Sequence, residues 1–244
     1  MIERYRDVII IYEDKNAYVV SCDSTGSIGN KPNDRIKVDE EIVGRSSVRV
    51  ALSEALSVGA KPVIISDTLS NEMSPTGEKI IKGIKDELDE NGFFNVLLTG
   101  STEENFETSM TAVGITVVAK AKKEDLKIKK VLSGMDIALM GYPHVGLEVL
   151  TSDDVLTLKD YMSICDCCEI VEAVPVGSKG INYELKVLEE ITGLKVKNQY
   201  QESLDVYKSG GPSTCCIVVY KKINTHDIAN LLYNKPFTYI GFFE

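Results

Sequence analysis

The sequence has few of the features that mark a membrane-bound, disordered or repetitive protein. Its apolar run at residues 8–11 is too short for a membrane span or for the core of a signal peptide. Proline-, serine- or glutamine-rich tracts, short repeats and long blocks of one charge are missing, which argues against disorder and solenoid folds. With 244 residues, 43 % of them hydrophobic, the chain can fill one large core or two smaller ones.

Basic residues are also scarce. The 27 lysines and arginines are outnumbered by 37 aspartates and glutamates, so the net charge is −10. Such a charge repels nucleic acid and anionic membranes over long range, and we therefore expect neither as a partner. An acidic enzyme that handles a polyphosphate must offset its charge locally, with divalent cations, backbone N–H groups and a few lysines.

Signatures of nucleophilic catalysis are missing too. His144 and His226 are the only histidines, and neither lies at the spacing of a known dyad from a cysteine or serine. We expect His144, in Tyr-Pro-His-Val-Gly, to be a loop residue rather than a base. The Walker A order Gly-x-x-x-x-Gly-Lys-Ser/Thr is absent as well.

Six cysteines are present, but not at metal-binding or disulfide-scaffold spacings. They stand at positions 22, 165, 167, 168, 215 and 216, which fits neither a Cys-x-x-Cys zinc knuckle nor a stapled secreted domain. We expect free thiols in a reducing compartment, and hence a cytoplasmic protein.

The hydrophobic pattern predicts an α/β (α+β) protein with two domains, residues 1–130 and 131–244, on either side of a lysine-rich connector. Short runs rich in β-branched and aromatic residues predict strands, and apolar stripes at three- and four-residue steps predict helices. In the first domain we predict strands at 8–12, 17–22, 63–66, 95–98 and 111–118, and helices at 40–58 and 74–92. In the second we predict strands at 136–140, 169–175, 215–220 and 238–243, and helices at 154–164, 183–192 and 227–233.

Residues 21–31, Ser-Cys-Asp-Ser-Thr-Gly-Ser-Ile-Gly-Asn-Lys, form the first segment that could carry chemistry. A strand here delivers Asp23 into a glycine-rich loop that ends at Lys31. Glycines let backbone N–H groups approach phosphate oxygens, the lysine adds positive charge, and the aspartate can bind a cation. The alternative is an ordinary glycine-rich loop after an edge strand. The candidate phosphate contacts are Gly26, Ser27, Gly29 and Lys31.

Two further segments of the first half carry carboxylates. Glu54 interrupts a helix of small and apolar residues, where it could face a metal or lie on the solvated side. Glu103 and Glu104 follow a hydrophobic strand, in a position where α/β proteins place ligands. With Asp23 they could complete a Mg²⁺ site, although a plain acidic turn is also possible.

Two glycine loops stand in the second half. Residues 175–181 precede a predicted helix, so their N–H groups would lie at a helix N-terminus beside Lys179. Residues 208–213 precede a strand and could equally be an ordinary turn. The candidate contacts to phosphate or substrate are Gly177, Ser178, Lys179, Gly210 and Gly211.

Together and in this order, the first three segments resemble the superfamily of aminoimidazole ribonucleotide synthetase, thiamine-phosphate kinase and selenophosphate synthetase (PurM-like proteins). The resemblance covers most of residues 8–120 and weakens to the two glycine loops beyond. It implies an ATP-binding domain whose sheet pairs with that of a second subunit in a homodimeric barrel, and a second α/β domain that closes over the site. It also implies that Asp23 and Glu54 are metal ligands.

The sequence departs from the better-known members at two places. Ser101 replaces an acidic residue of the family's Gly-Gly-Asp/Glu-Thr segment, and Pro-Val-Gly-Ser-Lys-Gly replaces an aspartate-containing stretch. We assign the missing carboxylate to Glu104 or Glu103. Three sequence motifs resemble one branch of the superfamily, the α-ribazole kinases. They are Cys-Asp-Ser-x-Gly-x-Ile-Gly, Gly-Ser-Thr-Glu-Glu-Asn-Phe and Pro-Val-Gly-Ser-Lys-Gly.

This resemblance implies an ATP- and Mg²⁺-dependent kinase that phosphorylates the 5′-hydroxyl of α-ribazole in salvage of the lower ligand of cobalamin. Asp23, Lys31 and Lys179 would be its catalytic residues. Such a kinase needs alignment and charge neutralisation more than a strong base. Two rival functions stay open: another ATP-dependent enzyme of the superfamily, and a non-catalytic nucleotide-binding protein with the same fold.

Overall fold

The computed structural model describes residues 1–200 and 202–244, which form two compact units. The N-terminal unit contains Met1–Ala55 and Ala60–Lys123, and the C-terminal unit contains Leu56–Gly59 and Glu124–Glu244. Across the described residues, every helix is too short or too polar to pass through a bilayer.

The N-terminal unit is built on a six-stranded sheet with the order β1-β2-β3-β8-β6-β7. All neighbours in it are antiparallel except β6 and β7, which are parallel because α2 connects them. β6 extends beyond the strand predicted at 63–66, β7 begins two residues later than the strand predicted at 95–98 and continues to Thr102, and β1 was not predicted. The strands are β1 (Ile2–Tyr5), β2 (Val8–Glu13), β3 (Asn16–Gly26), β6 (Lys61–Leu69), β7 (Leu97–Thr102) and β8 (Ala112–Lys122), with a small parallel pair β4 (Ile28–Gly29) and β5 (Ile36–Lys37) beside them.

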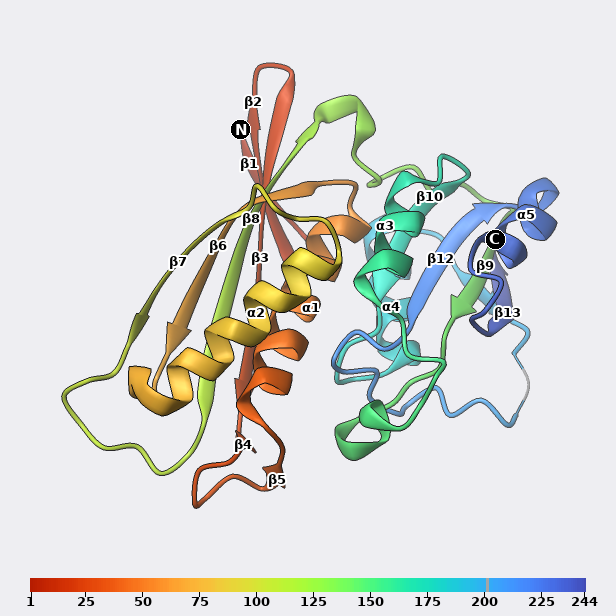
Figure 1. Cartoon of the computed structure of the whole chain (residues 1–244). Helices are drawn as coiled ribbons and strands as arrows, with labels where there is room; N and C mark the ends of the chain where they lie inside the picture. Colours follow the sequence, from red (N-terminus) through yellow and green to blue (C-terminus); the bar gives the residue numbers. More distant parts are fainter. Residues whose placement is uncertain (201) are drawn as a thin grey trace. The chain divides into compact units, whose positions relative to one another are not determined.

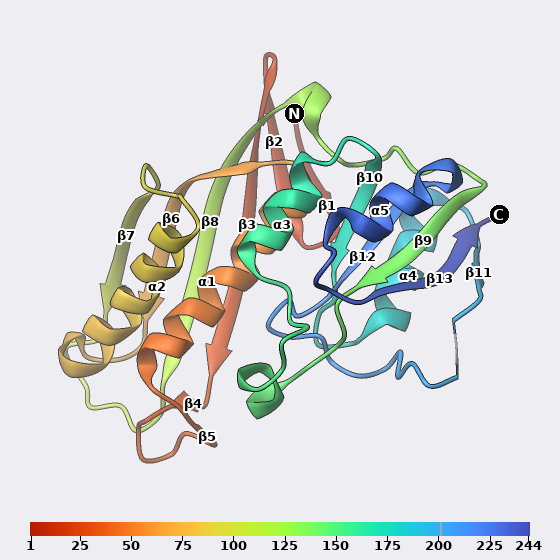
Figure 2. The same cartoon turned by 45° about the vertical axis from the view of Figure 1, so that its right-hand side comes forward.

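Two helices, α1 (Glu40–Ser57) and α2 (Glu78–Glu90), cover one face of this sheet (Figures 1 and 2). They approach closely because glycines stand at the contact. A Cβ at Gly44 would lie 2.1 Å from the Ile80 carbonyl oxygen, and one at Gly83 would lie 2.0 Å from that of Glu41. Arg45 of α1 reaches Glu87 and Glu90 of α2. This pair of helices is therefore fixed by both close packing and charge.

The start of α2 differs from the prediction. We expected Ser74 to cap a helix that begins there, but Ser74 has an extended backbone with φ −112° and ψ 125°. A short helical turn, η1 (Met73–Gly77), precedes α2, and its first regular residue is Glu78. The Ser-Pro signal marks the turn instead of the helix.

The sheet face opposite α1 and α2 carries an apolar row. The register places Ile9, Val20, Val118, Ile64 and Leu97 opposite one another on five successive strands. Directly paired residues project from the same face of a sheet. Leu97 is 70 % exposed, and Ile9 and Ile64 are also exposed. A continuous apolar row of this kind is typical of a surface that pairs with another protein surface.

The C-terminal unit contains a five-stranded sheet with the order β10-β12-β9-β13-β11, in which every pair is antiparallel. The alternation of strands and helices along the chain thus arises without parallel strands, and β11 was not predicted. The strands are β9 (Met135–Met140), β10 (Ile170–Pro175), β11 (Val196–Asn198), β12 (Cys216–Lys221) and β13 (Phe237–Phe243).

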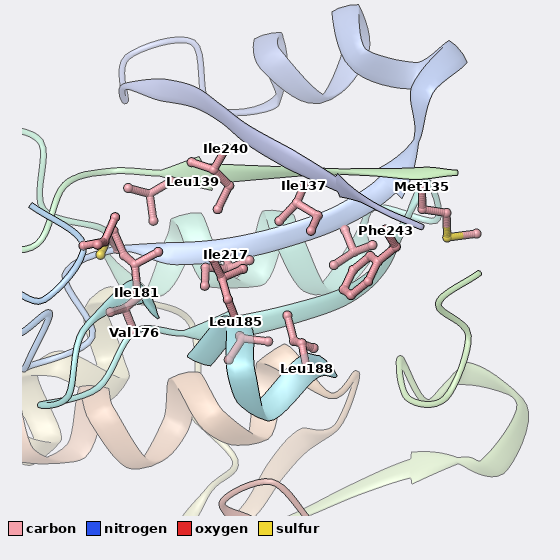
Figure 3. Close-up of a cluster of buried hydrophobic side chains, with 14 residues drawn as sticks. Met135, Ile137, Leu139, Val176, Ile181, Leu185, Leu188, Ile217, Ile240 and Phe243 are labelled. Carbon is pink, nitrogen blue, oxygen red and sulfur yellow. The ribbon is translucent and has the colours of Figure 1, made fainter. Parts of the chain in front are cut away.

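The core of this unit lies between the sheet and α4 (Ile181–Thr192). Ile137, Leu139 and Ile217 of the sheet face Leu185 and Leu188 of α4 (Figure 3). All five are buried. At about 25 cal/mol per Å² of apolar surface removed from water, each such side chain stabilises the fold by roughly 2 kcal/mol. This core also fixes the loop that precedes α4.

Two shorter helices, α3 (Leu158–Asp166) and α5 (Thr225–Leu231), contact β10 and β12. The predicted start of α3 at residue 154 is wrong by four residues. Thr157 caps the helix: its hydroxyl accepts the Asp160 N–H, and the Asp160 carboxylate accepts the Thr157 N–H at 2.7 Å. This capping box is readable in the sequence Thr-Leu-Lys-Asp.

Candidate functional site

Asp23 lies near the end of β3, in a row that crosses the sheet. Ile115 of β8 stands between Asp23 and Asp67 of β6, and Gly100 of β7 completes the row. Paired residues share a face, and alternation along β3 puts Asp23 on the same face as Ser21, whose hydroxyl donates to the Ala51 carbonyl of α1. The two carboxylates therefore project toward the helices, about 10 Å apart at two strand spacings.

Both carboxylates are held in surroundings that disfavour their charge. Burial raises the pKa of Asp23 and that of Asp67 above the ordinary aspartate value. Asp67 is only 2 % exposed, and the positive charge of Lys85 offsets its burial only in part. Buried carboxylates that keep raised pKa values are typical of sites that receive a cation or a proton.

Gly100 makes room for Asp67. A Cβ at this position would lie 2.2 Å from the Asp67 carboxylate oxygen Oδ1, closer than any real contact. The glycine of the Thr-Gly-Ser-Thr segment thus has a steric role that the sequence did not reveal. Sequence analysis missed Asp67 as a site residue, because its neighbour Gly100 comes 33 positions later in the chain.

Hydroxyl groups link Asp23 to α1. Thr25 Oγ1 donates to Asp23 Oδ2 at 3.4 Å, and Ser47 Oγ of α1 donates to Thr25 Oγ1 at 2.8 Å. Ser47 is buried, and it lies on the helix face that meets the sheet. This chain fixes the end of β3 against the helix.

The predicted phosphate loop is a turn that Asp34 holds in place. Gly26 still belongs to β3, and Ser27 turns the chain with φ 63°. Asp34 accepts hydrogen bonds from the N–H groups of Lys31 and Thr111 at 2.9 and 2.8 Å. At Gly29, with φ 149°, a Cβ would lie 2.4 Å from Thr111 Oγ1. Gly29 thus lets the loop approach Thr111, whereas a Cβ at Gly26 would meet nothing within 4 Å.

Lys31 forms an ion pair within the protein. Its Nζ lies 2.7 Å from Glu72 Oε2 and donates to the Thr108 carbonyl at 3.0 Å. Burial acts to raise the pKa of Glu72, but hydrogen bonds from Lys31 and Thr76 outweigh it and the pKa is lowered. A phosphate would therefore compete with Glu72 for this lysine.

Glu103 and Glu104 order their own loop. Glu104 accepts hydrogen bonds from the Met73 N–H and the Thr102 hydroxyl, both at 2.8 Å. Glu103 accepts the Asn105 N–H at 2.7 Å, and this bond lowers its pKa. Glu104 and Lys31 both contact the Glu72–Met73 step, so the structure brings these two predicted residues together.

Glu54 lies further along α1. It follows Ser47, the residue that reaches Thr25, by seven positions, which is about 10 Å along a helix axis. Among the described residues, no three of the histidine, cysteine, aspartate and glutamate side chains gather into a group that could hold a metal alone. A metal here would take most of its ligands from water and phosphate oxygens. The role of Glu54 stays a prediction.

In the C-terminal unit the two glycine loops pack against each other. The Gly210 N–H donates to the Gly177 carbonyl at 3.1 Å, and the Gly177 N–H reaches Glu184 Oε1 at 3.4 Å. Gly180 begins α4 with φ 78°. Ser178 and Lys179 are exposed at the turn, and Lys179 Nζ lies 4.1 Å above the Tyr183 ring. The Gly211 N–H donates to Ser209 Oγ at 3.3 Å.

Comparison with known proteins identifies the fold. Residues 6–121 match the family described as AIR synthase related protein, N-terminal domain. No curated protein sequence matches the chain. The structure resembles AaThiL complexed with AMPPCP and TMP, with a TM-score of 0.67 and 12 % identity over 98 % of this chain and 84 % of that chain.

Two other solved structures are also similar. Thiamine-monophosphate kinase from Stenotrophomonas maltophilia K279a has a TM-score of 0.64 and 15 % identity, over 99 % of this chain and 88 % of that chain. T. maritima PurL complexed with ATP has a TM-score of 0.67 and 15 % identity, over 96 % of this chain and 41 % of that chain. The chain therefore has the mixed α/β, PurM-like fold that the sequence predicted.

Proposed function

We propose that this protein is an ATP- and Mg²⁺-dependent small-molecule kinase. One observation supports this most: two carboxylates with raised pKa values, Asp23 and Asp67, lie in one row of the sheet and near a glycine loop. A kinase needs such groups to hold the cations that neutralise a polyphosphate. ATP or an ATP analogue is bound in two of the similar structures.

The chemistry of the donor set suits Mg²⁺. This ion binds one or two protein carboxylates and takes its other ligands from water and phosphate oxygens, which agrees with carboxylates spread along a row. Asp23 and Asp67 would each hold one ion, and Asp67 would supply the carboxylate that Ser101 lacks. Glu54, Glu103 and Glu104 remain predicted metal ligands. When bound, the ions would neutralise charge on the phosphates.

The protein's own residues would then position the nucleotide. The N–H groups of Gly26, Ser27 and Gly29 would contact phosphate oxygens, and Lys31 would leave Glu72 to pair with a phosphate. Alignment of the acceptor oxygen with the γ-phosphorus would lower the barrier without a covalent intermediate. Gly177, Ser178, Lys179, Gly210 and Gly211 would bind the substrate.

The acceptor that we propose is α-ribazole, through its 5′-hydroxyl. The support is the amino-acid sequence of three segments that resemble the α-ribazole kinases. These segments contain Asp23, Ser101 and Lys179. Thiamine-monophosphate kinases, which appear among the similar structures, are ATP-dependent relatives by fold alone. Tyr183, 40 % exposed beside Lys179, presents an aromatic ring of the kind that stacks on a nucleoside base.

We also propose a cytoplasmic homodimer that pairs the apolar rows of two N-terminal units. The row is Ile9, Val20, Val118, Ile64 and Leu97, and sheet faces of this composition pack together at about 10 Å. Sedimentation should give twice the mass of 26.9 kDa. A Leu97→Glu, Ile64→Glu double variant should sediment as a monomer, whereas a wild-type monomer would contradict the proposal.

The deciding experiment incubates the protein with ATP, Mg²⁺ and α-ribazole, with thiamine phosphate and selenide as alternative acceptors. Formation of α-ribazole 5′-phosphate, dependent on Mg²⁺ and abolished in Asp23→Asn, is expected. Product from another acceptor only would indicate a different enzyme of the superfamily. ATP binding without any product would indicate a non-catalytic nucleotide-binding protein.

A further inference from the structure

Two exposed tyrosines stand on adjoining backbone segments beside the glycine loops of the C-terminal unit. Tyr183 belongs to the first turn of α4 and is 40 % exposed, and Tyr207, just before the second loop, is 73 % exposed. The Asn182 N–H donates to the Val206 carbonyl at 2.9 Å. Each tyrosine directly follows one residue of this hydrogen-bonded pair, so the two side chains start from neighbouring points of the backbone.

The backbone that carries Tyr207 is fixed from both sides. Val206 is buried in the core of the unit. The Asp205 carboxylate accepts the N–H groups of Tyr207 at 3.0 Å and of Lys208 at 3.2 Å. Gly180 lets this segment cross the start of α4, since a Cβ there would lie 2.8 Å from the Val206 and Lys208 carbonyl oxygens. Tyr207 thus presents its ring from an ordered backbone, which lowers the entropy cost of binding a ligand.

The lysines beside these tyrosines already have partners. Lys179 Nζ lies 4.1 Å from the centre of the Tyr183 ring, and Lys208 Nζ lies 2.6 Å from Glu148 Oε2. An anionic ligand would have to draw a lysine out of one of these contacts, whereas an uncharged aromatic ligand would leave both intact. The charges therefore favour a neutral ligand at this place.

A pair of tyrosine rings suits a flat and apolar base. Every aromatic base has a π-face, and stacking on one aromatic side chain changes affinity by roughly 5- to 150-fold. The base of α-ribazole, the proposed acceptor, is a dimethylbenzimidazole. It carries methyl groups where common bases carry amino and carbonyl groups, so stacking and apolar contact must supply most of its recognition.

We propose that Tyr183 and Tyr207 form an aromatic clamp that binds the base of the acceptor nucleoside. This inference rests on the proposed kinase function, and it adds Tyr207 to the residues that determine specificity. The base would stack on the face of the Tyr183 ring away from Lys179, and Tyr207 would cover the part of the base that is left open. The clamp would select acceptors by their ring, because the ribose is common to all nucleosides.

The test measures the Kd for α-ribazole by isothermal titration calorimetry without ATP. Tyr207→Ala and Tyr183→Ala should each raise this Kd about tenfold. Tyr207→Leu keeps apolar surface but has no π-face and should also weaken binding, whereas Tyr207→Phe should stay within about twofold of the wild type. In kinase assays of Tyr207→Ala, the KM for α-ribazole should rise by a similar factor while kcat stays nearly constant.

Three controls separate stacking from structure. Tyr233→Ala removes a tyrosine that is 90 % exposed and lies beyond α5, and it should leave the Kd for α-ribazole unchanged. The free base 5,6-dimethylbenzimidazole should lose affinity for Tyr207→Ala by the same factor as α-ribazole. The Kd for Mg²⁺-ATP should not change in Tyr207→Ala. Melting temperatures of all variants show whether each is folded.

The outcomes distinguish the two claims. A wild type that neither phosphorylates an acceptor nor binds α-ribazole overturns the kinase proposal and this inference with it. An active wild type whose folded Tyr207→Ala variant has the same Kd for α-ribazole overturns the inference alone. Tenfold weaker binding of Mg²⁺-ATP in Tyr207→Ala would also overturn it, since the ring would then serve the nucleotide. Binding of α-ribazole that depends on Tyr207, without any phosphorylation, would overturn the kinase proposal and support the clamp.

Discussion

The polar groups at the candidate sites of the two units differ in how well their neighbours stabilise them. In the N-terminal unit, burial raises the pKa values of Asp23 and Asp67, and the surrounding residues offset their charge only in part. In the C-terminal unit, the groups around Gly177 and Gly210 hydrogen-bond to one another. The first region therefore costs folding free energy, which a cation bound as proposed would offset, whereas the second is already ordered. We infer that the N-terminal unit binds charged ligands, whereas the glycine loops of the C-terminal unit keep a fixed shape.

The largest effect is expected from Asp67→Asn. This change removes a carboxylate from the proposed cation site, so kcat should fall by about 100-fold or more. The stabilisation by Mg²⁺-ATP, measured as a rise in Tm, should also disappear. The matched control is Asp86→Asn, an aspartate of α2 that pairs with Lys82. An equal rise in Tm with Mg²⁺-ATP in both variants would contradict the assignment of Asp67 to the cation site.

The same substitution should stabilise the protein without ligands. Because the pKa of Asp67 is raised in the folded state, the ionised carboxylate destabilises the fold at neutral pH. This cost falls as the pH drops through the raised folded pKa and is gone below the unfolded value of 3.8. Urea unfolding should therefore show Asp67→Asn as the more stable protein at pH 7, with the difference vanishing near pH 4. A less stable variant at pH 7 would contradict the assignment.

A pair of glycine variants should sharpen the contrast between the units. In Gly210→Ala the new Cβ would lie 2.7 Å from the Val176 carbonyl oxygen, which is backbone and cannot turn away. We expect a loss of about 1–3 kcal/mol in unfolding free energy. In Gly100→Ala the Cβ would lie 2.2 Å from Asp67 Oδ1 and 2.6 Å from the Asp67 carbonyl oxygen, so calorimetry should show a loss at least as large. Kinase assays should show the larger loss of activity in Gly100→Ala, because Asp67 belongs to the proposed cation site.

A smaller effect is expected from Lys31→Met. If this lysine leaves Glu72 to bind a phosphate, the KM for ATP should rise roughly tenfold, because a charge-assisted bond is worth about 1.4 kcal/mol here. Glu72→Gln is the informative partner, since it frees Lys31 from its ion pair and should leave the KM for ATP equal or lower. An unchanged KM in Lys31→Met, with a lower Tm, would make Lys31 a structural residue.

The smallest effect is expected from Lys179→Ala. Its ammonium group lies over the Tyr183 ring in an exposed turn, where such a contact contributes about 0.5–1 kcal/mol. The KM for α-ribazole should rise two- to fivefold, with kcat nearly constant. Lys186→Ala, in the middle of α4 and outside the glycine loop, should change neither value. A large drop in kcat would instead give Lys179 a part in phosphoryl transfer.

Elements with strong local signals could be predicted from the sequence. The long helix α1 was predicted within one residue, because Gly59 ends it and its acidic first turn begins it. A strand was predicted at residues 17–22 from its β-branched and aromatic residues, but β3 continues to Gly26, so Asp23 lies within the strand and not in the loop after it. The start of α3 was misplaced although Thr157 and Asp160 form a readable cap. The start of α3 was missed because the apolar pattern was followed instead of the cap, and the start of α2 was missed because Ser74 was taken for a cap.

The residues that could not be predicted depend on strand neighbours. Asp67 and Gly100 meet because β6 and β7 pair in parallel across α2, and no local pattern states which strands become neighbours. Lys31 looked free for phosphate in the sequence, yet Glu72, 41 positions later, pairs with it. The topology of the fold determines charge partners of this kind. A single sequence therefore predicts the loop but does not show that its lysine is already paired.

The apolar row on the uncovered face of the first sheet links folding to concentration. If Leu97, Ile64 and their neighbours are buried only when two chains meet, each chain leaves part of its apolar burial unrealised on dilution. The Tm should then rise with protein concentration, and activity measured at nanomolar enzyme should fall below proportionality. The amount of this protein in a cell would itself regulate the fraction that is folded and active.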